Sequence, residues 1–265
     1  MAGMADLTVS LSFLLGIVVF SEVARRTVLY LFPNRNWIIY ALELISTFQL
    51  CACTHELKLL AEIGGLEPRI ALTLTFLISV VHGLSFRGAI CNPTGALEQL
   101  YLGTLMRRCA LTRISCQLIA AEAARRVMPH AWALALSDLH AQHSLTGFSC
   151  TNSPVNAPLP QAAAVELGCA FVMHTAAFNA EKVEEKYRVP AMAAVITILV
   201  YAALAFSIQF VCPGNSFAEY SFVYWIGPIL GMTGSLLLSD KVIPAISGKS
   251  TIPKHSNRLE TKKMK

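Results

Sequence analysis

The chain has 265 residues, of which 55% are apolar and 14% are charged, whereas charged residues make up about 25% of a soluble domain. The mean hydropathy of +0.55 and this composition exclude a disordered protein, a secreted disulfide-rich domain and a typical cytosolic enzyme. The whole net charge of +5 lies from Asp240 onward. This pattern predicts a multi-pass membrane domain over residues 1–240 and a disordered basic tail over residues 241–265. It argues against a nucleic-acid partner, which would need basic residues on a folded face.

A bilayer core about 30 Å thick needs about 20 apolar helical residues. Seven apolar stretches approach that length: residues 7–32, 37–60, 70–86, 111–136, 161–180, 189–211 and 220–239. The first has acidic and basic residues where a signal-peptide cleavage site would lie, so we expect it to be retained, as a span or as an interfacial helix. The fourth is the most charged. There, Glu122 lies three and four residues before Arg125 and Arg126, a spacing that favours ion pairs on one helix.

The distribution of basic residues predicts the orientation. No Lys or Arg occurs over residues 127–180, whereas basic residues gather at 87, 107, 108, 113, 182, 186, 188 and in the tail. The positive-inside rule therefore places these basic segments, with the C-terminus, on the cytoplasmic side. Cys150 and Cys212 then share the opposite side, where they either form a disulfide or remain free thiols.

Two internal features stand out. Glu43-Leu44 and Glu166-Leu167 open matching patterns in two apolar stretches. Because burying a carboxylate inside a membrane costs much free energy, the match suggests one structural role used twice, as in inverted repeats.

After the stretch 70–86, Asn92-Pro93 has the residues of a helix N-cap and first turn. A helix from Asn92 to about Gly103 is too short to cross a bilayer. It is either a capped surface helix or a re-entrant half-helix lining a water-filled cavity, whose N-terminus would repel cations and protons.

These features together resemble the aquaporin family. The resemblance is carried by an intramembrane Glu, by His82-Gly83, and by Gly88-Ala89 followed by Asn92-Pro93-Thr94 in place of the family's Asn-Pro-Ala. Further motifs resemble the superaquaporins, first of the aquaporin-12 type and then of the aquaporin-11 type. These motifs are Glu22-x-Ala24-Arg25-Arg26, Leu136-Ser137-Asp138-Leu139-His140 and Tyr224-Trp225-x-Gly227-Pro228.

The resemblance implies an all-α membrane protein, an aquaporin-like inverted-repeat helical bundle. In this family two half-helices meet at the membrane midplane, each capped by the Asn of its motif. Asn92 would donate a hydrogen bond to passing water, Pro93 and Thr94 would shape the turn, and Glu43 and Glu166 would brace the re-entrant loops. The family implies passive transport of water or small neutral solutes without enzymatic activity, cofactor or metal. It also implies a homotetramer surrounded by lipid in intracellular membranes such as the endoplasmic reticulum.

The second family motif is absent from the sequence. After Val200-Tyr201-Ala202 the chain continues directly with residues that resemble those following the second Asn-Pro, so about ten residues are missing by this comparison, and one re-entrant half-helix is retained. Leu204 occupies the position of the family's selectivity arginine. We therefore predict a continuous helix through residues 201–206. Two functions remain open: a conducting channel with an impaired pore, or a non-conducting splice form or incomplete gene product that associates with other subunits. An intramembrane enzyme is disfavoured because no nucleophile–base or metal set is visible.

Overall fold

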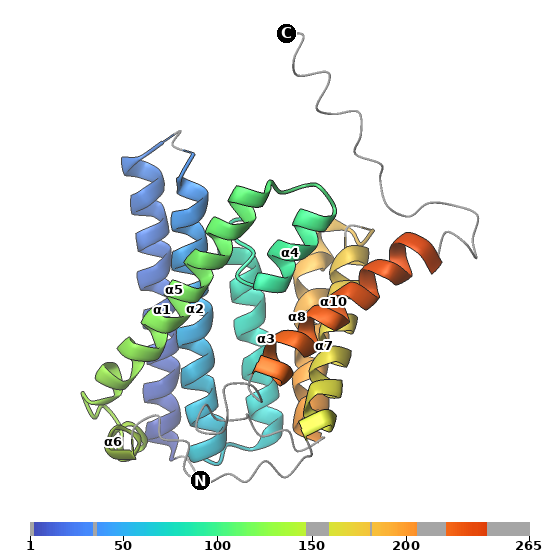
Figure 1. Ribbon diagram of the computed structural model, residues 1–265. Coiled ribbons are helices and arrows are strands. Elements are labelled where there is room, and N and C mark those ends of the chain that lie inside the picture. Colours follow the sequence, from blue (N-terminus) through green and yellow to red (C-terminus); the bar gives the residue numbers. More distant parts are fainter. Residues whose placement is uncertain (1–2, 34–35, 147–158, 181, 206–220, 243–265) are drawn as a thin grey trace.

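The computed structural model describes residues 3–33, 36–146, 159–180, 182–205 and 221–242, and all regular structure among them is helical. Figure 1 shows the helices as a bundle. The elements are α1 (Met4–Leu31), α2 (Ile38–Lys58), η1 (Leu59–Ile63), α3 (Pro68–Ser85), α4 (Pro93–Tyr101), α5 (Arg107–Trp132), α6 (Asp138–Thr146), α7 (Leu159–Ala180), α8 (Glu185–Ala205), η2 (Phe222–Ile226), α10 (Gly227–Leu237) and η3 (Leu238–Val242). The fold class predicted from the sequence, an all-α membrane protein, is confirmed.

Six helical segments are long and apolar enough to cross a membrane: α1, α2 with the start of η1, α3, α7, α8, and the continuous run η2–α10–η3. The fourth apolar stretch, residues 111–136, forms α5, a 26-residue helix whose charges keep it out of this set. In α5 the Nε atoms of Arg125 and Arg126 lie 2.7 Å and 2.6 Å from the Glu122 carboxylate, as the spacing predicts. The helix ends at Trp132, four residues before the predicted end.

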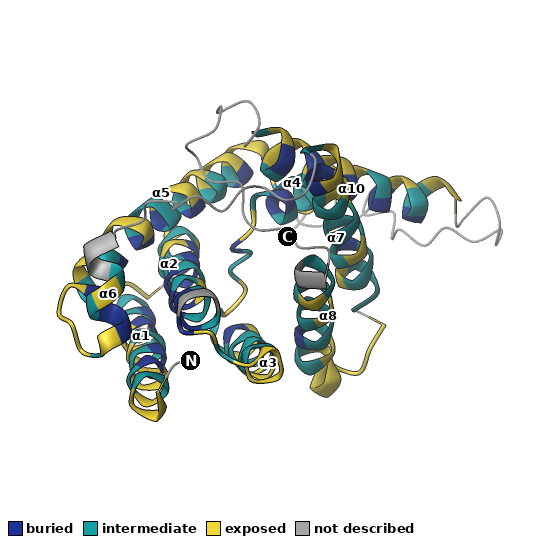
Figure 2. Ribbon diagram, turned by 90° about the horizontal axis from the view of Figure 1, so that it is seen from below, coloured by how far each residue is buried: buried dark blue, intermediate teal, exposed yellow. Residues whose placement is uncertain are grey.

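The outer faces of the bundle are apolar and uncovered. Large hydrophobic side chains such as Phe20, Leu84 and Ile198 are more than half exposed. Figure 2 shows exposed positions on the outer sides of the helices, whereas the buried positions turn toward neighbouring helices. A soluble monomer rarely leaves so much apolar surface in water, and helices satisfy their own backbone hydrogen bonds in lipid. The chain is therefore a multi-pass integral membrane protein.

The helices follow an inverted repeat. Within the first unit α2 packs along α5, within the second α7 packs along η2 and α10, and α3 packs against α8 between the two units. Glu43 lies in α2 and Glu166 in α7, so the matching carboxylates occupy equivalent helices. α1 lies outside this repeat, alongside α2 (Figure 1). The apolar stretch 7–32 is thus an additional helix that precedes the repeat.

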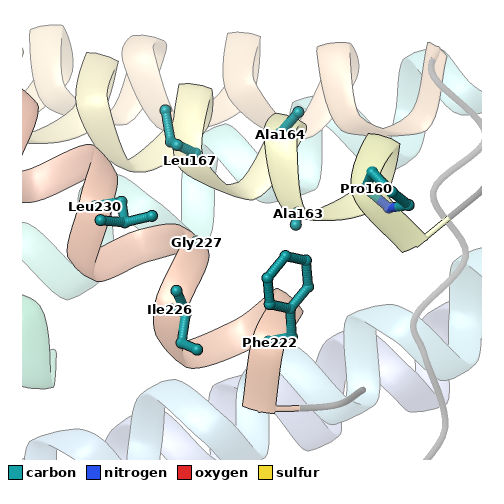
Figure 3. A pocket seen from close by; sticks show the side chains of 8 residues that line it. All are labelled: Pro160, Ala163, Ala164, Leu167, Phe222, Ile226, Gly227 and Leu230. Atoms are coloured by element: carbon teal, nitrogen blue, oxygen red, sulfur yellow. The ribbon is translucent and has the colours of Figure 1, made fainter. Parts of the chain in front are cut away.

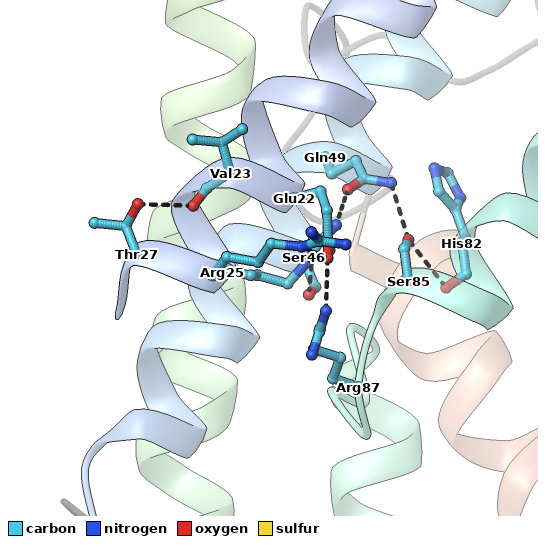
Figure 4. Close-up of polar contacts among 10 residues, drawn as sticks. Glu22, Val23, Arg25, Thr27, Ser46, Gln49, His82, Ser85 and Arg87 are labelled. Carbon is cyan, nitrogen blue, oxygen red and sulfur yellow. Dashed lines mark hydrogen bonds and ion pairs between the residues drawn. The ribbon is translucent and has the colours of Figure 1, made fainter. Parts of the chain in front are cut away.

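A buried arginine attaches α1 to the repeat (Figure 4). Arg25 is fully buried, and its Nη2 donates to Oε1 of Gln49 in α2 at 2.8 Å. Its Nε donates to Glu22 at 3.1 Å, and Arg87, beyond the end of α3, donates to the other oxygen of Glu22 at 2.6 Å. The charges that interrupt the first apolar stretch are therefore paired, which lowers the free-energy penalty for burying them.

Small residues bring α7 and α10 into close contact. A Cβ added at Gly227 would lie 3.0 Å from the carbonyl oxygen of Ala163, and one at Gly231 would collide with the carbonyl oxygen of Leu167. Glycines four residues apart let two membrane helices approach until their backbones touch. This contact fixes the second repeat unit, which in turn places the α7 side chains that face α4.

Candidate pore site

The short helix α4 begins where the sequence predicts. Asn92 is its N-cap, and the Asn92 Oδ1 atom accepts hydrogen bonds from the Thr94 backbone N–H at 3.0 Å and from the Thr94 hydroxyl at 2.9 Å. Pro93 occupies the first helical position, where its missing N–H breaks no helical hydrogen bond. The helix ends at Tyr101 after nine residues, a length of about 14 Å, and α4 packs against α5 and α10. It is a half-helix enclosed by the bundle.

The two ends of the Asn92 amide differ in their environment. Its oxygen is occupied by the two hydrogen bonds of the cap. Its Nδ2 group has no hydrogen-bond partner among the residues that the structure describes, and Asn92 is exposed although Thr94 beside it is buried. An Asn side chain carries two N–H donors, so both remain available to water at the N-terminus of α4.

Glu43 holds the backbone that leads into Asn92. The side chain is fully buried, and its carboxylate accepts from the N–H groups of Ile90 at 3.1 Å and Cys91 at 2.6 Å. It also accepts from Arg113 Nη1 at 3.1 Å and from Gln117 Nε2 at 2.7 Å, both on α5. One buried carboxylate therefore joins α2 and α5 to the connection before α4.

The backbone at Cys91 adopts φ of +54°, a left-handed conformation that is strained for a residue with a side chain. Such strain persists only where surrounding contacts enforce it. The 2.6 Å hydrogen bond from its N–H to Glu43 is one such contact. Arg113 and Gln117 are not predicted from the sequence to belong to this site. The sequence does contain a signal for them, because a basic and an amide residue four positions apart lie on one face of a helix.

Glu166 has a different environment from Glu43. It lies in α7 beside α10, where a Cβ added at Gly227 would be 3.4 Å from the Glu166 Cβ atom. Within the described ranges no hydrogen bond or ion pair involves its carboxylate. The sequence predicts that Glu43 and Glu166 play the same role, and among the described residues a re-entrant segment contacts Glu43. Residues 206–220, which follow α8, lie outside the described part.

The helix α8 is continuous over residues 201–205, as predicted, and Leu204 lies in its last turn. Phe206, the last residue of the predicted continuous stretch, lies outside the described residues, as do Cys150 and Cys212. In the described part of the chain, α4 is the only half-helix with an Asn cap.

A second polar cluster reaches the Asn92 cap from α7. His174 is 4% exposed, and its Nε2 atom lies 2.9 Å from the Thr94 hydroxyl. Its Nδ1 atom lies 2.6 Å from Oε2 of Glu98, one turn after Thr94 on α4. The sequence alone does not connect His174 with Asn92.

A small cavity of about 230 Å³ lies between α7 and the η2–α10 segment (Figure 3). Its lining is apolar and consists of Pro160, Ala163, Ala164, Leu167, Phe222, Ile226, Gly227 and Leu230. No side chain there offers a hydrogen bond to a polar solute. The polar groups of the candidate site lie instead around Asn92, and within the described residues no group of three His, Cys, Asp or Glu side chains could hold a metal ion.

No protein-family model matches the chain, but full-length relatives do. Aquaporin-12 of Mus musculus is 34% identical, with 97% of this chain and 94% of the relative aligned. Aquaporin-11 of Rattus norvegicus is 33% identical over 97% of this chain and 95% of the relative, and aquaporin-11 of Homo sapiens is 34% identical over 94% and 95%. The chain belongs to the aquaporin family.

The relatives confirm the superaquaporin type inferred from Asn92-Pro93-Thr94 and the flanking motifs. The structure agrees with this family assignment, since the six helices of the repeat and α4 form an aquaporin-like bundle with α1 added at its start. The aquaporin is thus a member of a family of membrane channels for water or small solutes.

Proposed function

We propose that this aquaporin is a passive channel for water or small neutral solutes and that Asn92 is the pore donor. The observation that carries the proposal is the asymmetry of the Asn92 amide. Its oxygen is used to cap α4, whereas its Nδ2 group is exposed and without a partner among the described residues. A passing water therefore meets a donor whose orientation the cap fixes.

The N-terminus of α4 adds an electrostatic barrier to this proposal. Aligned peptide dipoles place a partial positive charge of about half an elementary charge at a helix N-terminus. A cation or hydronium ion near Asn92 is repelled, whereas a neutral solute is not. Transport is then passive, without covalent chemistry, cofactor or metal. In this proposal Pro93 and Thr94 shape the turn, and Glu43 braces the connection that precedes it.

The selectivity of the pore depends on which residues the second repeat unit contributes to it. Leu204, at the position of the family's selectivity arginine, carries no charge, and α8 continues as a helix to Ala205. We propose that the one Asn cap among the described residues leaves a pore with one fixed donor, which is less selective than a pore with two. Glu166 is the corresponding bracing carboxylate of the second unit in this proposal.

The proposed topology places the C-terminus in the cytoplasm. The start of α5, the α7–α8 connection and the end of η3 lie at one end of the bundle, and the start of α1 lies at the other (Figure 1). Arg107, Arg108, Lys182 and Lys241 lie at the first of these ends, which the positive-inside rule assigns to the cytoplasm. The family resemblance further supports a homotetramer in the endoplasmic reticulum or related membranes.

A second candidate function is a non-conducting subunit that associates with intact aquaporins. The observation that favours it is the uninterrupted helix over residues 201–205, because a half-helix from the second repeat would be needed there to complete a two-donor pore. Packing of side chains across the pore axis would then block water.

Osmotic shrinkage of liposomes separates the two functions. The full chain is reconstituted at a known number of copies per vesicle, and shrinkage is followed by stopped-flow light scattering. We expect a water permeability above that of empty lipid, and an increased permeability to glycerol as a small neutral solute. Permeability equal to that of empty lipid for both would contradict the channel proposal and favour the non-conducting subunit.

A further inference from the structure

The Thr94 hydroxyl has one hydrogen and two neighbours. Asn92 Oδ1 and His174 Nε2 both lie 2.9 Å from the Thr94 Oγ1 atom. Asn92 Oδ1 can only accept, whereas the histidine nitrogen donates or accepts according to its protonation. If Nε2 carries a hydrogen, it donates to Thr94 and the Thr94 hydrogen goes to Asn92. If Nε2 is bare, it accepts the Thr94 hydrogen, and Asn92 keeps only the backbone N–H.

We propose that His174 is a positioning residue for Asn92, which acts through Thr94, and that one proton held by the Glu98–His174 pair sets its state. With both ring nitrogens protonated, Nδ1–H donates to the Glu98 carboxylate and Nε2–H donates to Thr94. Release of one proton to water leaves the remaining ring hydrogen on Nδ1, facing Glu98, and Nε2 without a hydrogen. The Thr94 hydroxyl then turns from Asn92 to His174. The effect on permeation rests on the channel function proposed above.

The protonation state thereby changes how firmly the pore donor is held. In the protonated state two donors fix the Asn92 oxygen, so its Nδ2 group keeps one orientation. In the deprotonated state only the Thr94 N–H remains. A neutral hydrogen bond contributes about 1 kcal/mol, which corresponds to about a fivefold change in the population of the fixed orientation. We therefore expect water permeability to be about two- to fivefold higher at pH 5.5 than at pH 8.

The Glu98–His174 pair contacts no further ionisable side chain among the described residues. In the described part of the chain, His174 and Glu98 form polar side-chain contacts only with each other and, through His174, with Thr94. α10 contains no ionisable side chain. The remaining ionisable groups of the elements packed on α4 and α7 include Arg113, which is bound to Glu43. The others are Tyr101 on α4, Arg107, Arg108, Cys109, Cys116, Glu122, Arg125, Arg126 and His130 on α5, Glu166 and Cys169 on α7, Glu185, Lys186, Tyr187, Arg188 and Tyr201 on α8, Tyr224 on η2, and Asp240 and Lys241 on η3.

The test compares pH profiles of variants in liposomes between pH 5.5 and pH 8. In His174→Gln the side-chain amide can still donate to Thr94 but does not titrate, so we expect permeability to be independent of pH. In Glu98→Gln no carboxylate favours the protonated ring, so permeability should remain near the pH 8 value of the wild type. His130→Gln, at an exposed position in the last turn of α5, is the matched control and should retain the wild-type profile.

A second readout does not depend on permeation. Nitrogen-15 NMR of histidine-labelled protein in lipid distinguishes the doubly protonated ring from the two neutral tautomers, and the signal absent in His174→Gln belongs to His174. We expect a one-proton step that ends with the hydrogen on Nδ1. A wild-type permeability equal to empty lipid, together with this step, would refute the channel while the switch stands. The absence of the step, or a wild-type pH profile in His174→Gln, would overturn the inference.

Discussion

Replacing Glu43 by alanine is expected to lower the free energy of unfolding by about 3–5 kcal/mol, because breaking a buried ion pair leaves an uncompensated charge. The side chain is fully buried and accepts hydrogen bonds from four groups, two of which are backbone N–H groups at the entry to α4. Without it the guanidinium of Arg113, 13% exposed, loses its partner. The left-handed Cys91 loses the contact that holds its N–H. Unfolding in detergent titrated with SDS measures the change.

The matched control is Glu166→Ala in the equivalent helix of the second unit. Glu166 has no hydrogen bond or ion pair among the described residues, so its removal is expected to change the free energy of unfolding by less than about 1 kcal/mol. The two variants remove the same atoms from matching helices. Equal losses in both would show that the hydrogen bonds to the α4 entry do not stabilise the fold.

Gly231→Ala is expected to destabilise the protein by about 3 kcal/mol or more, the upper range for overpacking in a close-packed contact. The added Cβ would meet the backbone carbonyl of Leu167 and lie 2.9 Å from both the Ala170 Cβ and the Phe171 backbone nitrogen. A backbone atom cannot move aside as a flexible side-chain end does, so α7 and α10 would have to separate. The same SDS titration, with a size-exclusion profile in detergent, detects this separation.

Gly168→Ala, on α7 itself, is the control and should have the opposite sign. No atom lies within 4 Å of a Cβ built at this position. Alanine in a helix is favoured over glycine by about 0.5–1 kcal/mol, so stability should be unchanged or slightly raised. A loss in Gly168→Ala as large as in Gly231→Ala would mean that the close contact at Gly231 does not cause the loss in stability.

The helices themselves could be predicted from the sequence because length and hydropathy decide which segments can lie in a bilayer. The α4 start at Asn92 was equally predictable, since Asn followed by Pro is a local capping signal. The position of α1 outside the repeat could not be predicted from the sequence. Its apolarity matches that of the repeat helices, and only the pairing of the helices in the fold shows that it stands outside the repeat. Local hydropathy carries no information about such a neighbour.

The candidate site was predictable where the chemistry is local and not where it depends on distant contacts. Asn92 and Glu43 stand out because a capping Asn and a buried carboxylate are unusual in an apolar stretch. Gln117 and His174 meet this site only because helices 70 or more residues away fold beside it, and their types alone fit many roles. Glu166 resembles Glu43 in sequence but has no equivalent partner in the described part of the chain, so the repeat predicts its position and not its contacts.

The water permeability per copy of Asn92→Asp, relative to that of the wild type, tests most directly whether Asn92 is the pore donor. Aspartate keeps an oxygen that caps α4 as well as asparagine does, and it lacks the Nδ2 hydrogens, so the fold is retained while the donor is lost. We predict a fall of about fivefold or more, which corresponds to the loss of one neutral hydrogen bond of about 1 kcal/mol. Equal permeability in a variant of unchanged stability would contradict the assignment of Asn92 as the pore donor.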